Sequence, residues 1–573
     1  MAPTPVVDPG VDAVIDELLR VPGTGPLAPR QLDAILRRHP KEGRGFYSKR
    51  EILRAFRAAP ARWSLPEPLF AERLRTCPTR SRSGILPVTV LTRPFPCPGR
   101  CIFCPDDVRM PKSYLADEPG CQRALQHRFD PYAQTWSRLD AYREMGHRTD
   151  KVELIVLGGT WSSLPEPYQR WFVARCLEAM NDFGEGVDRR LPPSRELRGE
   201  GDGAAPPRRR IARTEPVAGR AGWGRVQAAQ RANERAGARC VGLSLETRPD
   251  HVTGAELGRL RRLGATRVQL GLQSLDDAVL AANRRGHDVA CSRAAMEQLR
   301  AAGFKLQVHW MPNLYGATPE GDIRDFARLF DDPALRPDEL KIYPCSLVET
   351  AELVRVHARG KWAPYGHEVL VDLLAECLAR VPAWCRVSRV IRDIPSPDIV
   401  EGNRQTNLRE VVEARLGERG QRLVEIRSRE IGQRTIHAAA LVLRERRYAT
   451  SGGDEHFLEW STPEGRIAGF ARLSLPRGEP PFEELRGRAL LREVHVYGPV
   501  AGLGERGGGR AQHVGLGGRL VARAAEIAGA AGYPGLAVIS SVGTRSWYRR
   551  LGFRDGTLYQ HRALDGAARG SAR

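Results

Sequence analysis

No run of apolar residues in this 573-residue chain is long enough to cross a lipid bilayer. The N-terminal segment, MAPTPVVDPGVDAVIDELLR, lacks the basic start and the apolar run of a secretory signal. The 11 cysteines do not suggest a disulfide scaffold, and free thiols suit a reducing compartment. These absences argue against membrane-spanning and secreted classes of protein, and we expect a cytoplasmic one.

The chain also lacks the paired ligand arms that surround a structural zinc ion. It holds one Cys-x2-Cys step, and the nearest other thiols, Cys77 and Cys121, flank it at irregular distances. That step belongs to Cys97-Pro-Gly-Arg-Cys101-Ile-Phe-Cys104, which packs three thiolates into one short loop. Three soft thiolates can hold three corners of a four-iron, four-sulfur cluster. A zinc knuckle and a chance grouping are the alternatives, but ligand number and spacing favour the cluster.

No fourth ligand follows the loop at a matching interval, so one iron of such a cluster is left open. An open iron is what a cluster needs to bind and reductively cleave S-adenosylmethionine. We therefore predict a 4Fe-4S cluster on Cys97, Cys101 and Cys104, with S-adenosylmethionine as a cofactor.

Length and charge set broad limits on the protein. A chain of this length is expected to form two or three domains, each with its own core. The net charge of +21 and the pI near 9.9 favour a polyanionic partner. Arg greatly outnumbers Lys, however, and Ala, Gly and Pro abound, as in many proteins encoded by G+C-rich genes. Charge alone therefore favours nucleic acid only slightly.

Residues 1–80 are predicted to form a small helical unit, because apolar residues recur at helical spacing from Val11 to Leu19 and from Leu32 to Leu36. Its other faces are basic. The cations that would contact phosphates there are Arg37, Arg38, Lys41, Arg44, Lys49, Arg50 and Arg54. A solvated helix surface explains each of them singly.

Residues 81–400 alternate short apolar runs with helix-patterned segments, which predicts parallel βα units and an open, partial (β/α)6 barrel. The expected strands are Ile85–Leu91, Val152–Leu157, Cys240–Leu245, Thr266–Leu272, Leu306–Met311 and Leu340–Tyr343. Such folds carry their chemistry at the C-terminal strand ends. The cysteine loop follows the first strand, Gly158-Gly159-Thr160 the second, and Glu246 to Asp250 the third. Residues 184–222 are predicted to be a flexible insertion of low complexity.

Residues 401–573 are predicted to form a separate α+β domain after a linker. Expected strands are Ala438–Leu443, Arg466–Leu473, Leu490–Tyr497 and Leu536–Ile539. Between the last two lies Gln-x-x-Gly-x-Gly at Gln512–Gly517, where backbone amides and a helix N-terminus suit a pyrophosphate. With Tyr548 in a following helix, this order resembles the acetyl-coenzyme A domain of GNAT acetyltransferases. A purely structural glycine turn and a core tyrosine are the alternative.

The two signatures together resemble the catalytic subunit of Elongator, including its stand-alone prokaryotic forms. The resemblance runs from about Arg80 to about Tyr559. Its blocks include Lys151-Val152-Glu153, Glu246-Thr247-Arg248-Pro249-Asp250, Gly271-Leu272-Gln273-Ser274, Arg285-Gly286-His287, Leu340-Lys341-Ile342-Tyr343-Pro344 and Gly543-Thr544-Arg545. The chain departs from the family pattern at Asn313-Leu314-Tyr315-Gly316, at Ile391 and in the insertion.

The resemblance implies an enzyme that forms 5-carboxymethyluridine at the wobble uridine of tRNA from acetyl-coenzyme A by a radical mechanism, and that contacts the anticodon stem-loop. It implies that Lys151 meets acetyl-coenzyme A from the barrel side and that Tyr548 lies near the thioester. The expected S-adenosylmethionine contacts are Gly158, Gly159, Glu246 and Arg248. The expected acetyl-coenzyme A contacts are Glu493, Val494, His495, Val496, Leu516, Gly517, Gly518, Tyr548 and Lys151.

Two other classes of function are weighed against this one. A protein lysine acetyltransferase with a structural iron-sulfur domain would need only the C-terminal domain. It leaves the open ligand position and the Gly-Gly-Thr strand end unexplained. A zinc protein that binds nucleic acid without catalysis leaves the C-terminal domain unexplained.

Overall fold

The computed structural model describes residues 9–23, 27, 29–41, 45–74, 84–190, 222–432, 438–497 and 515–564. The predicted boundary near residue 80, most of the predicted insertion and the start of the predicted glycine loop, Gln512–Val514, lie outside these residues. Of the helices in the described ranges, none has both the length and the apolar character needed to span a bilayer.

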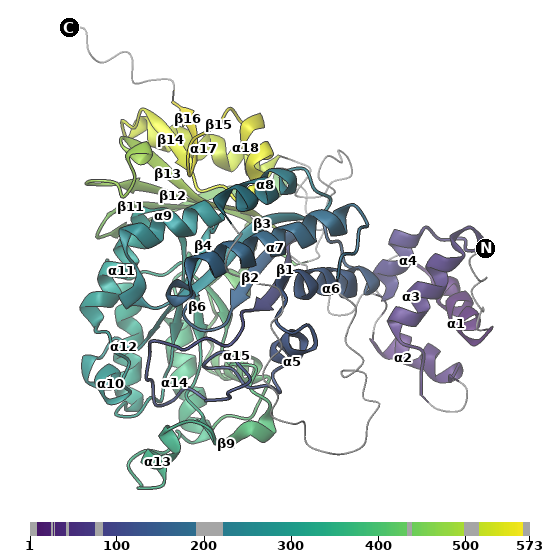
Figure 1. Cartoon of the computed structure of the whole chain (residues 1–573), viewed down its shortest axis with the longest axis horizontal. Helices are drawn as coiled ribbons and strands as arrows, with labels where there is room; N and C mark the ends of the chain where they lie inside the picture. Colours follow the sequence, from purple (N-terminus) through teal and green to yellow (C-terminus); the bar gives the residue numbers. More distant parts are fainter. Residues whose placement is uncertain are drawn as a thin grey trace.

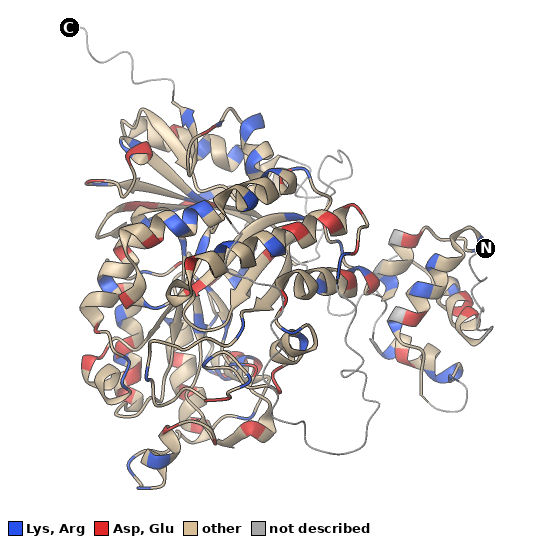
Figure 2. Ribbon diagram, viewed as in Figure 1, with Lys and Arg blue, Asp and Glu red and all other residues tan. Residues whose placement is uncertain are grey.

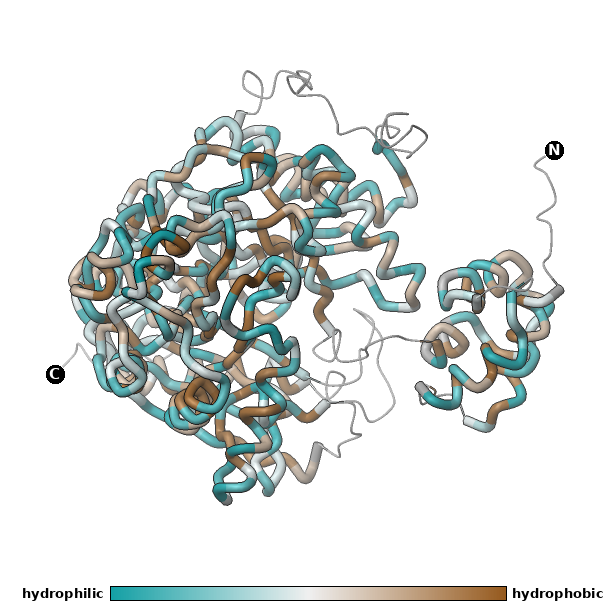
Figure 3. The backbone as a smooth tube through the Cα atoms, turned by 90° about the horizontal axis from the view of Figure 1, so that it is seen from below, coloured by the Kyte–Doolittle hydropathy of each residue, from teal (hydrophilic) through white to brown (hydrophobic). Residues whose placement is uncertain are grey.

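Four helices form an N-terminal unit with its own hydrophobic cluster: α1 (Pro9–Arg20), α2 (Pro29–Arg38), α3 (Lys49–Ala58) and α4 (Glu67–Leu74). The residues predicted to share one helical face, such as Val14 and Ile15, are buried in that cluster. Ser48 caps α3 through a reciprocal pair of hydrogen bonds with Glu51. The unit stands to one side of the larger body (Figures 1 and 3). Arg57 on α3 donates a hydrogen bond of 2.9 Å to the carbonyl of Arg143.

A parallel sheet dominates the middle of the chain and confirms the predicted partial barrel. Within the described residues its seven strands follow the order β1 (Leu86–Leu91), β2 (Lys151–Leu157), β3 (Arg239–Thr247), β4 (Arg267–Gln273), β5 (Lys305–Trp310), β6 (Glu339–Ile342) and β8 (Arg386–Arg389). The first six agree with the predicted strands. The seventh, β8, was not predicted, because its sequence Arg-Val-Ser-Arg offers a single apolar residue.

Helices follow the barrel strands along the chain, and most of them cover the outside of the sheet (Figure 1). They are α5 (Pro119–Gln126), α6 (Pro131–Glu144), α7 (Glu166–Gly184), α8 (Trp223–Asn233), α9 (Gly254–Leu263), α10 (Asp277–Ala282), α11 (Val289–Ala301), α12 (Pro319–Asp331), α13 (Leu353–His357), α14 (His367–Ala379), α15 (Leu408–Glu418) and α16 (Ile426–Arg429). A small ribbon pairs β7 (Leu347–Val348) with β9 (Ile399–Glu401).

The C-terminal part of the chain forms a second, mixed sheet. In the described residues its order is β10 (Val442–Thr450), β11 (Gly453–Ser461), β12 (Ile467–Pro476), β13 (Arg488–Val496), β14 (Gly535–Val538), β16 (Gln560–Ala563) and β15 (Arg554–Asp555), with helices α17 (Leu516–Ala530) and α18 (Arg545–Arg550). The expected strand over Ala438–Leu443 is corrected: Ala438–Ala440 is a short helical turn, and the strand begins at Val442. Strand β11 was not predicted, because charged residues interrupt its apolar pattern.

The second sheet packs against the N-terminal ends of the barrel strands, opposite the end that carries the cysteine loop. A Cβ atom on Gly543 would lie 2.7 Å from Cβ of Arg239 at the start of β3, so only glycine allows this approach. The Tyr559 hydroxyl donates to the carbonyl of Ala302 at 2.7 Å, just before β5. One hydrophobic cluster contains residues of both sheets. Cations and anions are interspersed along the ribbons (Figure 2).

Candidate functional site

A cavity of about 1270 Å³ runs from the cysteine loop through the inside of the barrel to the C-terminal sheet. Cys97, Cys101 and Cys104 line it at one end, and Glu493 and Tyr548 line it at the other. Its wall between these ends consists largely of side chains from the barrel strands. The two groups of residues predicted from separate motifs are therefore brought to one continuous space.

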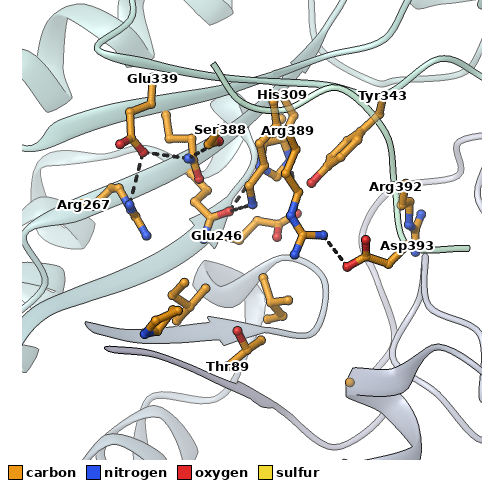
Figure 4. Close-up of a pocket in the computed structure, with 18 of the residues that line it drawn as sticks. Thr89, Glu246, Arg267, His309, Glu339, Tyr343, Ser388, Arg389, Arg392 and Asp393 are labelled. Carbon is orange, nitrogen blue, oxygen red and sulfur yellow. Dashed lines mark hydrogen bonds and ion pairs between the residues drawn. The ribbon is translucent and has the colours of Figure 1, made fainter. Parts of the chain in front are cut away.

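The inward positions of β4, β5 and β6 are polar, unlike the branched apolar filling of closed barrels. Alternate side chains of a strand point to the same face, so Arg267 and Gln269 of β4 both line the cavity. Alternate side chains of β5 and β6 line it in the same way. Those are Lys305, Gln307, His309, Glu339, Lys341 and Tyr343. Figure 4 shows Glu246, His309 and Tyr343 gathered at the pocket, and Arg267 paired with Glu339. Of these barrel residues, Glu246 alone was predicted from the sequence to contact a cofactor. Polar residues alternating through buried parallel strands were the available signal.

The cysteine loop is held from behind by two arginines. Arg285 donates a hydrogen bond to the Cys101 sulfur at 3.3 Å, and Arg248 lies 4.0 Å from the same atom. The pKa of Cys101 is lowered to about 5, first by a hydrogen bond from the Cys104 thiol and then by the two guanidinium groups, against the effect of burial. The Cys97 sulfur lies 3.9 Å from the Thr160 hydroxyl. The sequence analysis missed the role of Arg285.

The donor set suits a cluster better than a single ion. Among the described side chains, no three or more of His, Cys, Asp and Glu are grouped so that they would hold one metal ion. The three loop thiols nevertheless open onto the same cavity. A cubane cluster binds each thiolate through a different iron, so its ligands stand farther apart than those of one zinc ion. The flanking guanidinium groups also suit an anionic cluster. The residues fit the predicted cluster, and its presence stays a prediction.

Some of the residues at the C-terminal ends of β2 and β3 line the cavity, and others pack behind its wall. Gly159 lines the cavity, whereas Gly158 packs against Thr92, whose Oγ1 would lie 1.9 Å from an added Cβ. Arg248 is buried, and its guanidinium donates to Asp250 at 2.9 Å and to the Arg285 carbonyl at 2.6 Å. Gly158 therefore supports the wall from behind, whereas Arg248 also lines the cavity, and the contacts of both with S-adenosylmethionine stay predictions.

Glu246 faces a group of polar side chains in the cavity. Burial raises the pKa of its carboxyl, and Lys341 opposes that rise. Burial lowers the pKa of Lys341 to about 7, against the attraction of Glu246, and the ammonium donates to Gln269 Oε1. His309 Nδ1 lies 3.8 Å from Glu246, and its Nε2 lies 3.2 Å from Gln269. The group therefore brings hydrogen-bond donors and acceptors together at one place in the cavity.

Strand β13 and α18 supply the opposite end. Glu493, Val494, His495 and Tyr548 line the cavity, whereas Val496 does not. Burial raises the pKa of the Tyr548 hydroxyl, so that the phenol stays protonated at neutral pH.

The residues predicted to hold the pyrophosphate lie at the start of α17. Leu516, Gly517 and Gly518 form its first turn but do not line the cavity. An added Cβ on Gly517 would lie 3.3 Å from the ring of Trp547 and 3.6 Å from Val496. The first turn of α17 thus packs closely against Trp547 and against Val496, the last residue of β13, and position 517 favours a small residue.

Lys151 is the first residue of β2 and does not line the cavity. Its register partner is Arg239, the residue that packs against Gly543 in the turn after β14. Burial lowers the pKa of the Lys151 ammonium. Lys151 is therefore near the junction of the two sheets, as its predicted role requires, although no contact with acetyl-coenzyme A is tested.

Comparisons with known proteins agree with this arrangement. A model of the radical SAM superfamily matches residues 215–330, and one of the radical SAM C-terminal domain matches residues 337–418. The chain is 38% identical over 494 residues to a tRNA uridine(34) acetyltransferase of Dehalococcoides mccartyi, covering 85% of this chain and 99% of that protein. It is 35% identical over 499 residues to Elongator complex protein 3 of Danio rerio, covering 84% of each. The solved archaeal Elp3 of Methanocaldococcus infernus, with an N-terminal deletion, superposes with a TM-score of 0.68 at 32% identity, covering 84% of this chain and all of that one.

Proposed function

The chain belongs to the family that contains the tRNA uridine(34) acetyltransferases and Elongator complex protein 3, and on that premise we propose that it modifies uridine 34 of tRNA with acetyl-coenzyme A. The product is 5-carboxymethyluridine, and S-adenosylmethionine initiates the reaction. The substrate is the anticodon stem-loop, whose unpaired bases can be splayed out and read.

One observation carries the proposal. A single cavity is lined both by the cysteine loop and by the β13 and α18 residues expected to hold the acyl donor. Carbon 5 of uridine is a poor partner for an unactivated acetyl methyl group, so radical chemistry and the acyl donor must meet in one space. Enclosing that space in the protein positions the substrates and excludes water.

Cys97, Cys101 and Cys104 would hold the iron-sulfur cluster, which when bound supplies the reductive cleavage of S-adenosylmethionine at its open iron. Residues around the loop would assist in binding the cluster and S-adenosylmethionine. Arg285 and Arg248 stabilise Cys101 as the thiolate that binds iron. Gly159 leaves room at the strand end next to the loop.

The polar group around Glu246 suits the nucleoside substrates. Lys341 donates, Glu246 accepts, and the neutral His309 ring does either. At the other end, the edge of β13 offers backbone groups to a pantetheine arm, and Tyr548 keeps its proton near the thioester. The first turn of α17 offers its N-terminus to the pyrophosphate.

The lysine acetyltransferase alternative is not favoured. A transfer to a protein lysine would need an acceptor groove at the C-terminal sheet and no connection to the cysteine loop. The shared cavity supports the tRNA reaction instead, and so do the names of the relatives.

The decisive experiment supplies the anaerobically reconstituted protein with dithionite as the one-electron reductant and with acetyl-coenzyme A labelled in its acetyl carbons. We expect the label in 5-carboxymethyluridine from tRNA with a wobble uridine, and only when S-adenosylmethionine is present. Mass spectrometry of digested nucleosides measures it. Label that enters a lysine peptide while tRNA stays unlabelled would overturn the proposal in favour of the acetyltransferase.

A further inference from the structure

Strand β13 contains a bulge at the point where it faces the barrel. Its pairing with β12 aligns Glu493 with Arg472 and Leu491 with Leu473, so that Arg492 is the extra residue. A bulge redirects the side chains next to it and twists the strand. Here it turns two consecutive charged side chains, Arg492 and Glu493, toward partners in the barrel.

Arg492 is fully buried and is bound by groups from both sheets. Its guanidinium donates to the carbonyl of Phe304 at 2.8 Å and forms an ion pair with Asp338. It also donates to Glu455 of β11 at 2.8 Å. Phe304 and Asp338 precede β5 and β6, so the floor of the barrel supplies two of the three partners.

Glu493 is also bound by one group from the barrel and one from its own sheet. Lys305, the first residue of β5, donates to its carboxylate at 2.6 Å, and Arg472 of β12 donates to it at 2.9 Å. Arg472 also reaches the barrel, where it donates to the carbonyl of Trp384 at 2.7 Å. Each charge of the bulge thus has one partner in its own sheet and at least one in the barrel.

These ion pairs are in a part of the protein where an unpaired charge is strongly unfavourable. Burial alone would raise the pKa of Asp338, but Arg492 and Arg472 offset this effect and lower the pKa to about 2. The Asp338 carboxylate also accepts a hydrogen bond of 2.8 Å from the backbone of Leu306. The bulge and the starts of β5 and β6 are therefore fixed to one another.

We propose that Lys305 and Asp338 are positioning residues for the acyl donor. From the barrel they set the backbone of Glu493–Val496, the strand along which acetyl-coenzyme A binds. The inference rests on the proposed function of that strand. Its consequence is that affinity for acetyl-coenzyme A depends on two charged side chains of the other sheet.

The test measures the dissociation constant of acetyl-coenzyme A by calorimetry in the full chain, beside cluster content and melting temperature. Asp338→Asn and Lys305→Glu should each weaken binding about tenfold, a coupling typical of residues within one ion-pair network. Cluster content should stay at the wild-type level. Lys305→Arg should keep most of the affinity, because a cation at this position retains the ion pairs with Glu493 and Glu339. Lys305→Met serves as a milder variant if a charge reversal prevents folding.

The matched control is Arg429→Met. Arg429 forms a buried ion pair with Glu459 of β11 at 2.9 Å and donates to the carbonyl of Ala383, and none of its hydrogen bonds goes to β13. It should lower the melting temperature without changing the affinity for acetyl-coenzyme A. Wild-type affinity in folded Asp338→Asn and in a folded Lys305 variant would overturn the inference. If the wild-type protein itself did not bind acetyl-coenzyme A, the proposed function would fall first.

Discussion

Arg285 donates a hydrogen bond to the sulfur of Cys101 across 3.3 Å, although the two residues are 184 positions apart in the chain. The same guanidinium also donates to the carbonyl of Gly271 at the end of β4. The cysteine loop is thus tied to the barrel wall through a charged group. Both residues are buried, so the bond is little weakened by solvent.

We predict that Arg285→Met weakens retention of the iron-sulfur cluster. A hydrogen bond to a charged group contributes about 1.5–3 kcal/mol, and its loss also raises the pKa of the Cys101 thiol. Iron and sulfide analysis after gel filtration measures retention, and electron paramagnetic resonance reports the cluster environment. Arg284→Met is the control, since the exposed Arg284 pairs with Glu352 on the surface. Equal iron retention in both variants would contradict the assigned role.

Replacing any one of Cys97, Cys101 and Cys104 by Ala should remove most of the cluster from anaerobically purified protein. Two ligands hold a cluster less well than three, and each loop thiol faces the same cavity. The controls are Cys176→Ala and Cys377→Ala. Both thiols lie in the hydrophobic core, where burial raises their pKa and keeps them protonated, so neither is expected to bind iron. Stoichiometric zinc without iron in the wild-type protein would refute the cluster.

Gly517→Glu should raise the Kd of acetyl-coenzyme A at least about tenfold, which corresponds to about 1.4 kcal/mol. The new side chain would place bulk against Trp547 and a negative charge where the pyrophosphate is expected. Gly529→Glu is the matched control, because Gly529 is on the same helix with open space around its Cα. Calorimetry measures binding, and cluster content should be unchanged in both variants.

The pH dependence of stability should reveal Lys341. Its folded pKa is lowered to about 7, below the value near 10.4 in an unfolded chain. Between these values the unfolded state binds one proton more, so the free energy of unfolding rises with pH. The melting temperature of the wild-type protein should therefore increase relative to Lys341→Met from pH 7 to pH 10. The charged groups around Lys341 are Glu246, Arg267, Glu339 and Arg389, and a difference that stays constant over this range would contradict the assignment.

Features formed by residues that are close together in the sequence could be predicted from it. Three cysteines on one loop are held together by the chain itself, and apolar runs located six barrel strands. Strand β8 escaped because one apolar residue in Arg386–Arg389 gives no pattern. The roles of Arg285 and Lys341 were not predicted, because these residues reach the site only when the barrel strands come together in the fold. Gly158 was assigned to a cofactor, whereas the close approach of Thr92 already requires glycine there.

Hydrolysis of acetyl-coenzyme A should be coupled to the binding of tRNA. Hydrolysis of acetyl-coenzyme A without a base to modify wastes the acyl donor, so the thioester should be protected until the anticodon stem-loop is bound. We expect slow hydrolysis by the protein alone, faster hydrolysis with tRNA that has a wobble uridine, and little gain from tRNA without it. Release of free coenzyme A measures the rate.

The same coupling should depend on the basic N-terminal helices. Of the cations first considered there, Arg44 and the side chain of Arg50 lie outside the described residues. Arg37 and Arg54 are exposed on α2 and α3, so Arg37→Glu and Arg54→Glu should weaken tRNA binding and reduce its salt slope by about one each. Arg380→Glu, an exposed change just after the end of α14, is the control. Because these helices are remote from the cysteine loop in Figure 1, cluster content should not change. Unaltered salt dependence in both helix variants would mean that the stem phosphates are bound elsewhere.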